Sequence, residues 1–212
     1  MIKSIIFDVG RVLMTDVPLK KIAKDLSVRF SIPEDELHSH LYPNQHWTLL
    51  TLGKISEDEY WEYFLKASKV KVDKKELKER VRTELRPIEE NVKVVPLLKR
   101  QYQLSILSNH SREWSEFMTK EYDFFNYFDQ IIFSCDVGLR KPDTRIYKLA
   151  LTKLGSEPEE CLFIDDKERN TDGAQKVGMK TITLENVFGL REKLFGLGIA
   201  LGETDHVKKQ KQ

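Results

Sequence analysis

Five short apolar segments, rich in β-branched residues, constrain the fold of this chain more than any other feature. They are KSIIF (3–7), QLSIL (103–107), QIIFS (130–134), CLFID (161–165) and KTITL (180–184). Their apolar residues are nearly continuous rather than alternating, which predicts strands that are buried on both faces. Helical patterns over 111–122, 143–154 and 168–177 separate the last four strands. This repeated strand–helix–strand order predicts an α/β fold with a parallel sheet flanked by helices.

The first two strands are separated by nearly a hundred residues, far more than one crossover needs. The last part of this gap, ENVKVVPLLKRQ (90–101), supplies the expected crossover helix, with Pro96 near its first turn or at a kink. The rest has helical patterns throughout. We therefore predict a Rossmann-like core of residues 1–16 and 87–212, with a helical cap of four to five helices, 17–86, inserted after the first strand.

Two segments of the predicted cap carry helix-start signals. SEDEYWEYFLKASK (56–69) begins with Ser56 and has Glu59 three residues later, which is a capping-box arrangement. DKKELKERVRTEL (73–85) repeats the spacing with Asp73 and Glu76. Both patterns predict helices that start at these polar residues.

Charge and cysteine content narrow the class of partner. The chain has 35 basic and 34 acidic residues, whereas nucleic-acid and anionic-membrane binding usually require a strong basic excess. Cys135 and Cys161 lie in apolar segments without zinc or disulfide spacing, so we expect buried thiols and a reduced, cytoplasmic setting. MIKSIIFD is too short for a signal peptide, and no apolar stretch approaches a membrane span. The polar tail HVKKQKQ (206–212) is expected to fray.

Polar residues stand at the carboxyl ends of four predicted strands, where parallel α/β sheets bind ligands. In strand order they are Asp8, then Ser108 and Asn109, then Arg140 and Lys141, then Asp165 and Asp166 with Asn170. Taken singly, each residue also fits a structural role. Ser108 or Asn109 could cap the next helix, as Ser111 could equally, and the Asp165–Asp166 pair could cap the helix near 168. Lys141 could be a solvated surface lysine before Pro142.

The joint pattern favours chemistry over these separate roles. Neighbouring carboxylates repel one another unless a cation lies among them, and hard oxygen ligands suit Mg²⁺. A metal and a lysine can neutralise phosphate oxygens while a carboxylate attacks phosphorus, giving an aspartyl-phosphate that water hydrolyses. We expect a small phosphorylated molecule as substrate.

Four motifs in order, IIFDVG, LSN, LRKPD and FIDDKERN, make the chain resemble the haloacid dehalogenase superfamily of aspartate-nucleophile phosphatases. The sequence from 138 to 182 is most similar to the branch of this superfamily that contains α-D-glucose-1-phosphate phosphatases and the N-terminal phosphatase domains of soluble epoxide hydrolases. The resemblance covers nearly the whole chain. It implies the Rossmann-like core, the helical cap and Mg²⁺ as cofactor.

The resemblance also implies roles for individual residues. Asp8 would be the nucleophile and a metal ligand, Gly10 would offer its backbone carbonyl to the metal, and Asp166 would be a direct ligand. Asp165 and Asn170 would support the metal site. Ser108 and Lys141 would hold the phosphate, close to Asn109 and the backbone of Gly10 and Arg11. For Arg11, a place along a hinge between the domains is the alternative.

Gly10 departs from the family pattern, which usually has an acid–base aspartate there. Such an acid–base group raises the reaction rate on the order of 100- to 10,000-fold. Three explanations stay open: a substrate whose leaving group needs little protonation, such as an anomeric sugar phosphate; a substitute carboxylate such as Asp16; or a phosphometabolite-binding protein without turnover. A 2-haloacid dehalogenase would use Asp8, Ser108 and Lys141 without metal, but usually with an aromatic residue in place of Gly10.

In the cap segment YPNQHWTLLTLGKIS (42–56), His46 and Trp47 could touch substrate, although we expect Trp47 to pack in a helical core and His46 to be structural or exposed. Tyr42, Trp61, Tyr63 and Phe64 are expected to pack within the cap. YDFFNYFDQ (122–130) reads as core, with a dimer surface as the alternative. We expect a monomer or a homodimer.

Overall fold

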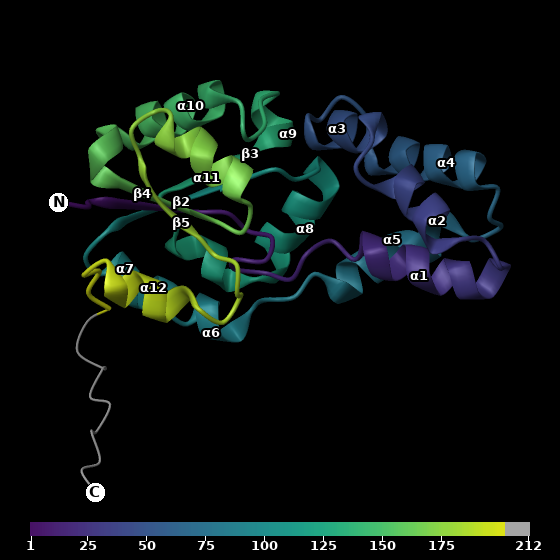
Figure 1. Ribbon diagram of the computed structural model, residues 1–212, viewed down its shortest axis with the longest axis horizontal. Helices are drawn as coiled ribbons and strands as arrows, with labels where there is room; N and C mark the ends of the chain where they lie inside the picture. The colour runs from purple at the N-terminus through teal and green to yellow at the C-terminus, as the bar shows by residue number, and fades with distance from the viewer. Residues whose placement is uncertain (202–212) are drawn as a thin grey trace, which may run out of the picture.

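A parallel five-stranded sheet with helices on both faces forms the centre of the computed structural model, which describes residues 1–201 (Figure 1). The strands are β1 (Ser4–Phe7), β2 (Gln103–Ser108), β3 (Gln130–Phe133), β4 (Cys161–Asp165) and β5 (Lys180–Thr183). Their order is β3-β2-β1-β4-β5. The α/β prediction is confirmed, and β1 lies in the middle, with β2 and β4 on either side. The fraying predicted for 206–212 lies outside the described residues.

Each face of the sheet buries its own apolar layer, which explains why the strands lack polar alternation. Ile6 and Phe163 face α10 (Thr144–Leu154) and α11 (Glu168–Gln175). Ile5 and Phe7 face the layer that contains α8 (Arg112–Glu121) and α12 (Leu190–Gly196). Figure 1 shows α10 and α11 on one side of the sheet and α12 on the other.

Several details differ from the sequence prediction. The crossover is two short helices, α6 (Glu89–Val92) and α7 (Val95–Lys99), and Pro96 stands in the first turn of α7, where its missing N–H costs nothing. Ser134, expected in the third strand, begins α9 (Ser134–Val137). Short 3₁₀ helices span Asp123–Tyr127 and Pro158–Glu160. Phe124, Phe125 and Phe128 are buried, as the core interpretation requires.

Five of the seven helices between β1 and β2 lie beside the sheet, beyond the end of β1 (Figure 1). They are α1 (Leu19–Phe30), α2 (Glu34–Leu41), α3 (Gln45–Thr51), α4 (Glu57–Ser68) and α5 (Lys74–Glu84). Ser56 and Glu59 form the predicted capping box. Asp73 caps α5 through Lys75 N–H at 2.8 Å, without the reciprocal bond that the spacing suggested. The boundaries 17–86 stay a prediction.

Specific contacts fasten this helical segment to the sheet and its helices. The buried carboxylate of Glu57 accepts hydrogen bonds from Arg82 and from Trp114 Nε1, which is in α8, at 2.6 and 2.7 Å. Gly53 has φ +66°, and a Cβ there would lie 2.3 Å from the carbonyl oxygen of Cys135. Only glycine fits this contact. Within residues 1–201, no helix has the length and apolar character needed to cross a membrane.

Candidate active site

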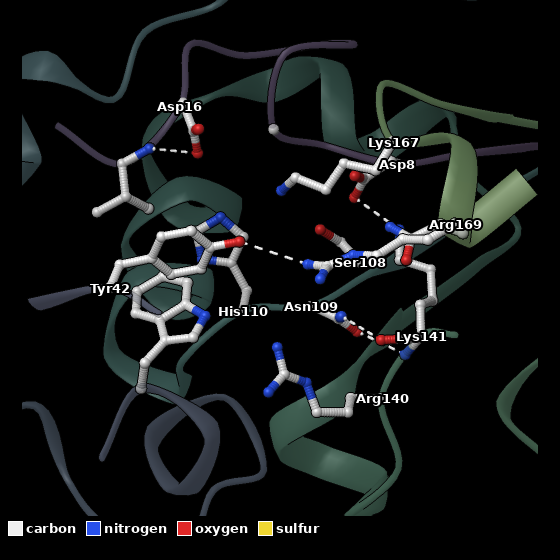
Figure 2. A pocket seen from close by; sticks show the side chains of 14 residues that line it. Asp8, Asp16, Tyr42, Ser108, Asn109, His110, Arg140, Lys141, Lys167 and Arg169 are labelled. Carbon is white, nitrogen blue, oxygen red and sulfur yellow. Dashed lines mark hydrogen bonds and ion pairs between the residues drawn. The ribbon is translucent and has the colours of Figure 1, made fainter. Parts of the chain in front are cut away.

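Asp8 is the first residue after the central strand, so it projects at the carboxyl edge of the sheet between β2 and β4 (Figure 2). Its backbone N–H donates to the carbonyl of Ile164 in β4 at 2.8 Å. Its carboxylate accepts from Val9 N–H at 2.8 Å and lies 3.0 Å from Lys141 Nζ. The residue is 6% exposed, which makes a fixed, nearly dry carboxylate.

Lys141 is the buried cation of the site, at 2% exposure. Its ammonium contacts Asp165 Oδ2 at 2.5 Å as well as Asp8, and it lies 5.1 Å from the ring centre of Phe163. Asn109 fixes the Lys141 backbone in both directions, because its Oδ1 accepts from Lys141 N–H and its Nδ2 donates to Lys141 C=O, each at 2.9 Å. The solvated-lysine alternative is therefore wrong.

Ser108 ends β2 and is 2% exposed, and its hydroxyl is among the groups that lower the pKa of Asp8. It caps no helix in the described chain: Ser111 caps α8, accepting from Trp114 N–H at 3.4 Å. Ser108 is thus left to face the pocket, together with Asn109.

Three carboxylates gather at the ends of β1 and β4. One oxygen each from Asp8, Asp165 and Asp166 lies within 4.8 Å of the others. Asp165 is fully buried and already accepts hydrogen bonds from Lys141 Nζ, Lys167 N–H and Asn170 Nδ2. Asp8 and Asp166 have fewer partners among the described residues. Their oxygens are therefore the ones most available to a cation.

The electrostatics of the three carboxylates differ. Burial opposes ionisation of Asp8, but the charges of Lys141 and Lys167 outweigh it and lower the pKa of Asp8. Burial and the charge of Asp8 raise the pKa of Asp165 to about 6, and burial also raises the pKa of Asp166. The site thus holds one ionised carboxylate and two that resist ionisation, a combination that a divalent cation would stabilise.

The donor set fits Mg²⁺. Besides the carboxylates, the buried Oδ1 of Asn170 has no hydrogen-bond partner among the described residues. Mg²⁺ binds through one or two protein carboxylates and keeps several waters, which could in turn satisfy a buried amide oxygen. These residues could hold the ion, with Asp165 and Asn170 in supporting positions; the individual ligand roles stay predictions.

The loop after β1 turns back sharply, and it brings Asp16 beside Gly10. Met14 N–H donates to Val9 C=O at 2.9 Å, and Arg11 N–H donates to Met14 C=O at 2.7 Å. A Cβ on Gly10 would meet only the Oδ1 of Asp16, at 3.7 Å. Asp16 and Gly10 line the same pocket as Asp8. A carboxylate therefore lies next to the space where the family usually has one.

Arg11 lies at the edge of the site rather than in the pocket. It is exposed, with φ +58°, and its Nε lies 3.2 Å from Asp166 Oδ2. The side chain thus faces an expected metal ligand instead of the pocket that Asp8 lines. Its phosphate-binding role stays a prediction.

Sequence reasoning missed several residues that line the pocket of about 40 Å³ above Asp8. They are Tyr42, His110, Lys167 and Arg169; Arg140, expected at this edge of the sheet, and Trp47, one of the two cap residues that could touch substrate, line it as well. Tyr42 and Trp47 pack against the apolar core, as expected, and they also line this pocket, whereas Trp61 and Phe64 are fully buried. His46 stacks on Tyr63, with ring centres 3.4 Å apart, and does not line this pocket.

His110 follows the LSN motif and is the buried imidazole of the pocket. Its backbone N–H donates to Ser134 Oγ at 3.1 Å, and its Nδ1 is buried without a partner among the described residues. Burial lowers its pKa to about 4, against the opposing charge of Asp8. The ring is therefore neutral at physiological pH. Its position one residue after a strand-end motif is the signal that could have identified it.

Comparison with known proteins gives a family match over most of the chain. The model for "Haloacid dehalogenase-like hydrolase" matches residues 5–184. Flavin mononucleotide hydrolase 1 of Arabidopsis thaliana is 26% identical over 92% of this chain and 77% of its own length. The match to bifunctional epoxide hydrolase 2 of Sus scrofa is 40% identical but spans 37% of this chain and 14% of that protein. Glyceraldehyde 3-phosphate phosphatase of Methanothermobacter thermautotrophicus is 26% identical over 55% of this chain and 47% of its own length.

Solved structures share the fold at low sequence identity. An enzyme of the same family from Bacteroides thetaiotaomicron, in complex with magnesium and inorganic phosphate, has a TM-score of 0.69 at 22% identity, covering 86% of this chain and 94% of that one. L-2-haloacid dehalogenase from Xanthobacter autotrophicus, with chloropropionic acid covalently bound, has a TM-score of 0.62 at 18% identity, covering 94% and 85%. The sheet and its helical insert thus occur in proteins with metal-bound and with covalent-ligand sites.

Proposed function

The chain belongs to the haloacid dehalogenase-like hydrolase family, and from that premise we propose that it is a Mg²⁺-dependent phosphatase. Its substrate would be a small phosphorylated metabolite, such as a sugar phosphate. The carboxylate cluster carries this proposal: Asp8, Asp165 and Asp166 offer oxygens within 4.8 Å of one another. A nucleophilic carboxylate alone would not need two further acids beside it.

In the proposed mechanism, the ionised Asp8 carboxylate attacks phosphorus and displaces the alcohol, forming an aspartyl-phosphate. Lys141 and Ser108 bind phosphate oxygens, and Asn109 holds Lys141 in place through its backbone. When bound by Asp8, Asp166 and the Gly10 carbonyl, Mg²⁺ would neutralise charge that develops on the phosphoryl group. Water then attacks phosphorus, and Asp8 leaves with its own oxygen.

Proton transfer to the leaving alcohol needs a group other than Gly10. The carboxylate of Asp16 supports a substitute role, because it lies 3.7 Å from the position of a Gly10 Cβ. Its Oδ1 accepts from Val17 N–H at 2.9 Å, which orients the carboxylate. A preference for leaving groups that need little protonation stays a prediction, as does the alternative of a binding protein without turnover.

Two relatives, a flavin mononucleotide hydrolase and a glyceraldehyde 3-phosphate phosphatase, also favour phosphate ester hydrolysis. The dehalogenase alternative retains support from the haloacid dehalogenase of similar fold. The buried, unpaired thiols of Cys135 and Cys161 fit a reducing, cytoplasmic setting. A monomer or homodimer acting on small molecules, rather than on nucleic acid or membranes, completes the proposal.

A phosphatase screen tests the proposed function. Inorganic phosphate release is measured over a metabolite panel with and without Mg²⁺, with Asp8→Asn as the blank. We expect Mg²⁺-dependent release that Asp8→Asn abolishes while the circular dichroism spectrum is unchanged. Metal-independent chloride release from 2-chloropropionate, without phosphate release from any ester, would favour the dehalogenase instead.

A further inference from the structure

Two arginines line the pocket without an acidic partner. Arg140 follows α9, and its Nη1 donates to Thr48 Oγ1 at 2.8 Å, while its Nε is buried with no partner. Arg169, in the first turn of α11, donates from Nη2 to Tyr42 Oη at 3.4 Å. Neither arginine forms an ion pair within residues 1–201. Figure 2 shows both side chains reaching toward the pocket from different elements.

The two cations also disfavour each other. Burial and the positive charge of Arg169 lower the pKa of Arg140. A neighbouring pocket, which both arginines also line, contains one carboxylate, Asp143, but this residue is already paired with Arg145 at 2.5 Å and caps α10. Arg140 is partly buried and lacks a counter-ion, which is costly, whereas Arg169 is exposed and adds a second positive charge beside it. An anionic ligand would stabilise this arrangement.

The position of the arginines relative to Asp8 identifies which part of a ligand they would meet. Both line the small pocket above Asp8, and both also line an adjoining pocket of about 340 Å³ with Tyr42, Trp47 and Thr48. With a phosphate next to Asp8 and Lys141, the leaving group extends away from these two residues. Arg140 and Arg169 border one of the directions that are open to it.

We propose that Arg140 and Arg169 bind a second anionic group, a carboxylate or a phosphate, on the leaving group of the substrate. The inference rests on the proposed function, since it takes the first phosphate to lie at Asp8. Guanidinium groups suit this task because their planar donors match the oxygens of carboxylate and phosphate. Tyr42 and Trp47 would cover the uncharged part that joins the two anions.

Matched ligand pairs test the proposal by calorimetry in the Asp8→Asn background with Mg²⁺, so that no ligand is consumed. One pair is glucose 1,6-bisphosphate and glucose 1-phosphate; the other is 3-phosphoglycerate and glycerol 3-phosphate. In at least one pair, we expect the ligand with two anionic groups to bind about 10- to 100-fold more tightly than the ligand with one. This range corresponds to the free energy of a charge-assisted hydrogen bond. Which pair shows the preference distinguishes phosphate from carboxylate.

Substitutions test whether these two arginines cause the binding preference. Arg140→Gln and Arg169→Gln should each remove most of the preference, Arg140→Lys should retain part of it, and Arg100→Gln should retain all of it, since Arg100 lines neither pocket. Thermal unfolding of each variant controls for loss of fold. Equal affinity within both pairs, no binding of any ligand, or a preference that survives both glutamine variants would overturn the inference.

Hydrolysis of 4-nitrophenyl phosphate, whose leaving group has no second anion, separates this inference from the proposed function. Mg²⁺-dependent turnover of that ester with no preference in the binding assay would refute the anion site alone. A clear binding preference without turnover of any ester would refute the phosphatase alone.

Discussion

Replacing Lys141 with methionine tests the charge balance that the site depends on. Methionine keeps the length and apolar contact of the side chain but removes an ammonium that lies 3.0 Å from Asp8 and 2.5 Å from Asp165. Unit charges about 3 Å apart attract by roughly 5 kcal/mol at an effective dielectric constant of ~20, before desolvation is subtracted. Removing one partner of a buried ion pair costs about 3–5 kcal/mol, and we expect a loss in that range.

The assay is urea unfolding of wild type and Lys141→Met, each with and without Mg²⁺. Without metal the variant should lose about 3–5 kcal/mol of unfolding free energy. Mg²⁺ should stabilise the variant more than the wild type, because Asp8 and Asp165 then lack their buried counter-charge. Lys176→Met, at an exposed lysine, is the matched control and should change little. A loss below about 1 kcal/mol for Lys141→Met would refute the reasoning.

Three further predictions concern Asp16 in the loop after β1, the imidazole of His110, and the close contact of Gly53 with the backbone of Cys135. Asp16→Asn should lower kcat for alkyl phosphates by ~100-fold but barely change kcat for 4-nitrophenyl phosphate. Adding Gly10→Asp to that variant should restore activity. An unchanged kcat for alkyl phosphates in Asp16→Asn would exclude Asp16 as the acid. Because His110 has a folded pKa of about 4 against 6.5 when unfolded, its stabilisation is present above pH 6.5 and is lost as the pH falls toward 4. Between pH 8 and pH 5, the free energy of urea unfolding should therefore fall by about 2 kcal/mol more for wild type than for His110→Gln. An equal fall in the two proteins would contradict this. Gly53→Ala should destabilise by ~1–3 kcal/mol more than Gly155→Ala, since both have positive φ but only Gly53 has a backbone oxygen where Cβ would go; equal losses in thermal unfolding would disprove the contact.

The sheet could be predicted because its strands carry a dense local signal. Strands buried on both faces must be apolar almost throughout, and the single polar residue at each end then stands out. Asp8, Ser108 and Asp165 follow from this signal and Lys141 from the segment after the third strand, and the structure brings all four to one edge of the sheet. The capping box at Ser56 is equally local, since both partners lie within one turn.

Other parts of the site depend on distances that no local pattern records. Tyr42 and Trp47 have the spacing of core residues, yet the packing of α2 and α3 places them over the pocket. Arg140 and Arg169 look like ordinary surface arginines until their lack of an acidic neighbour is known. The approach of Asp16 to Gly10 requires the loop from Val9 to Met14 to turn back, which follows from its backbone hydrogen bonds.

Rapid acid quenching of the enzyme during turnover, with borohydride reduction and peptide mass spectrometry, tests the covalent role of Asp8 most directly. Reduction converts an aspartyl-phosphate to homoserine, which marks the residue that carried the phosphoryl group. The account predicts homoserine at Asp8 in wild type when substrate and Mg²⁺ are both present, and at no other aspartate. Homoserine at a different position, or turnover at the wild-type rate by Asp8→Asn, would contradict it.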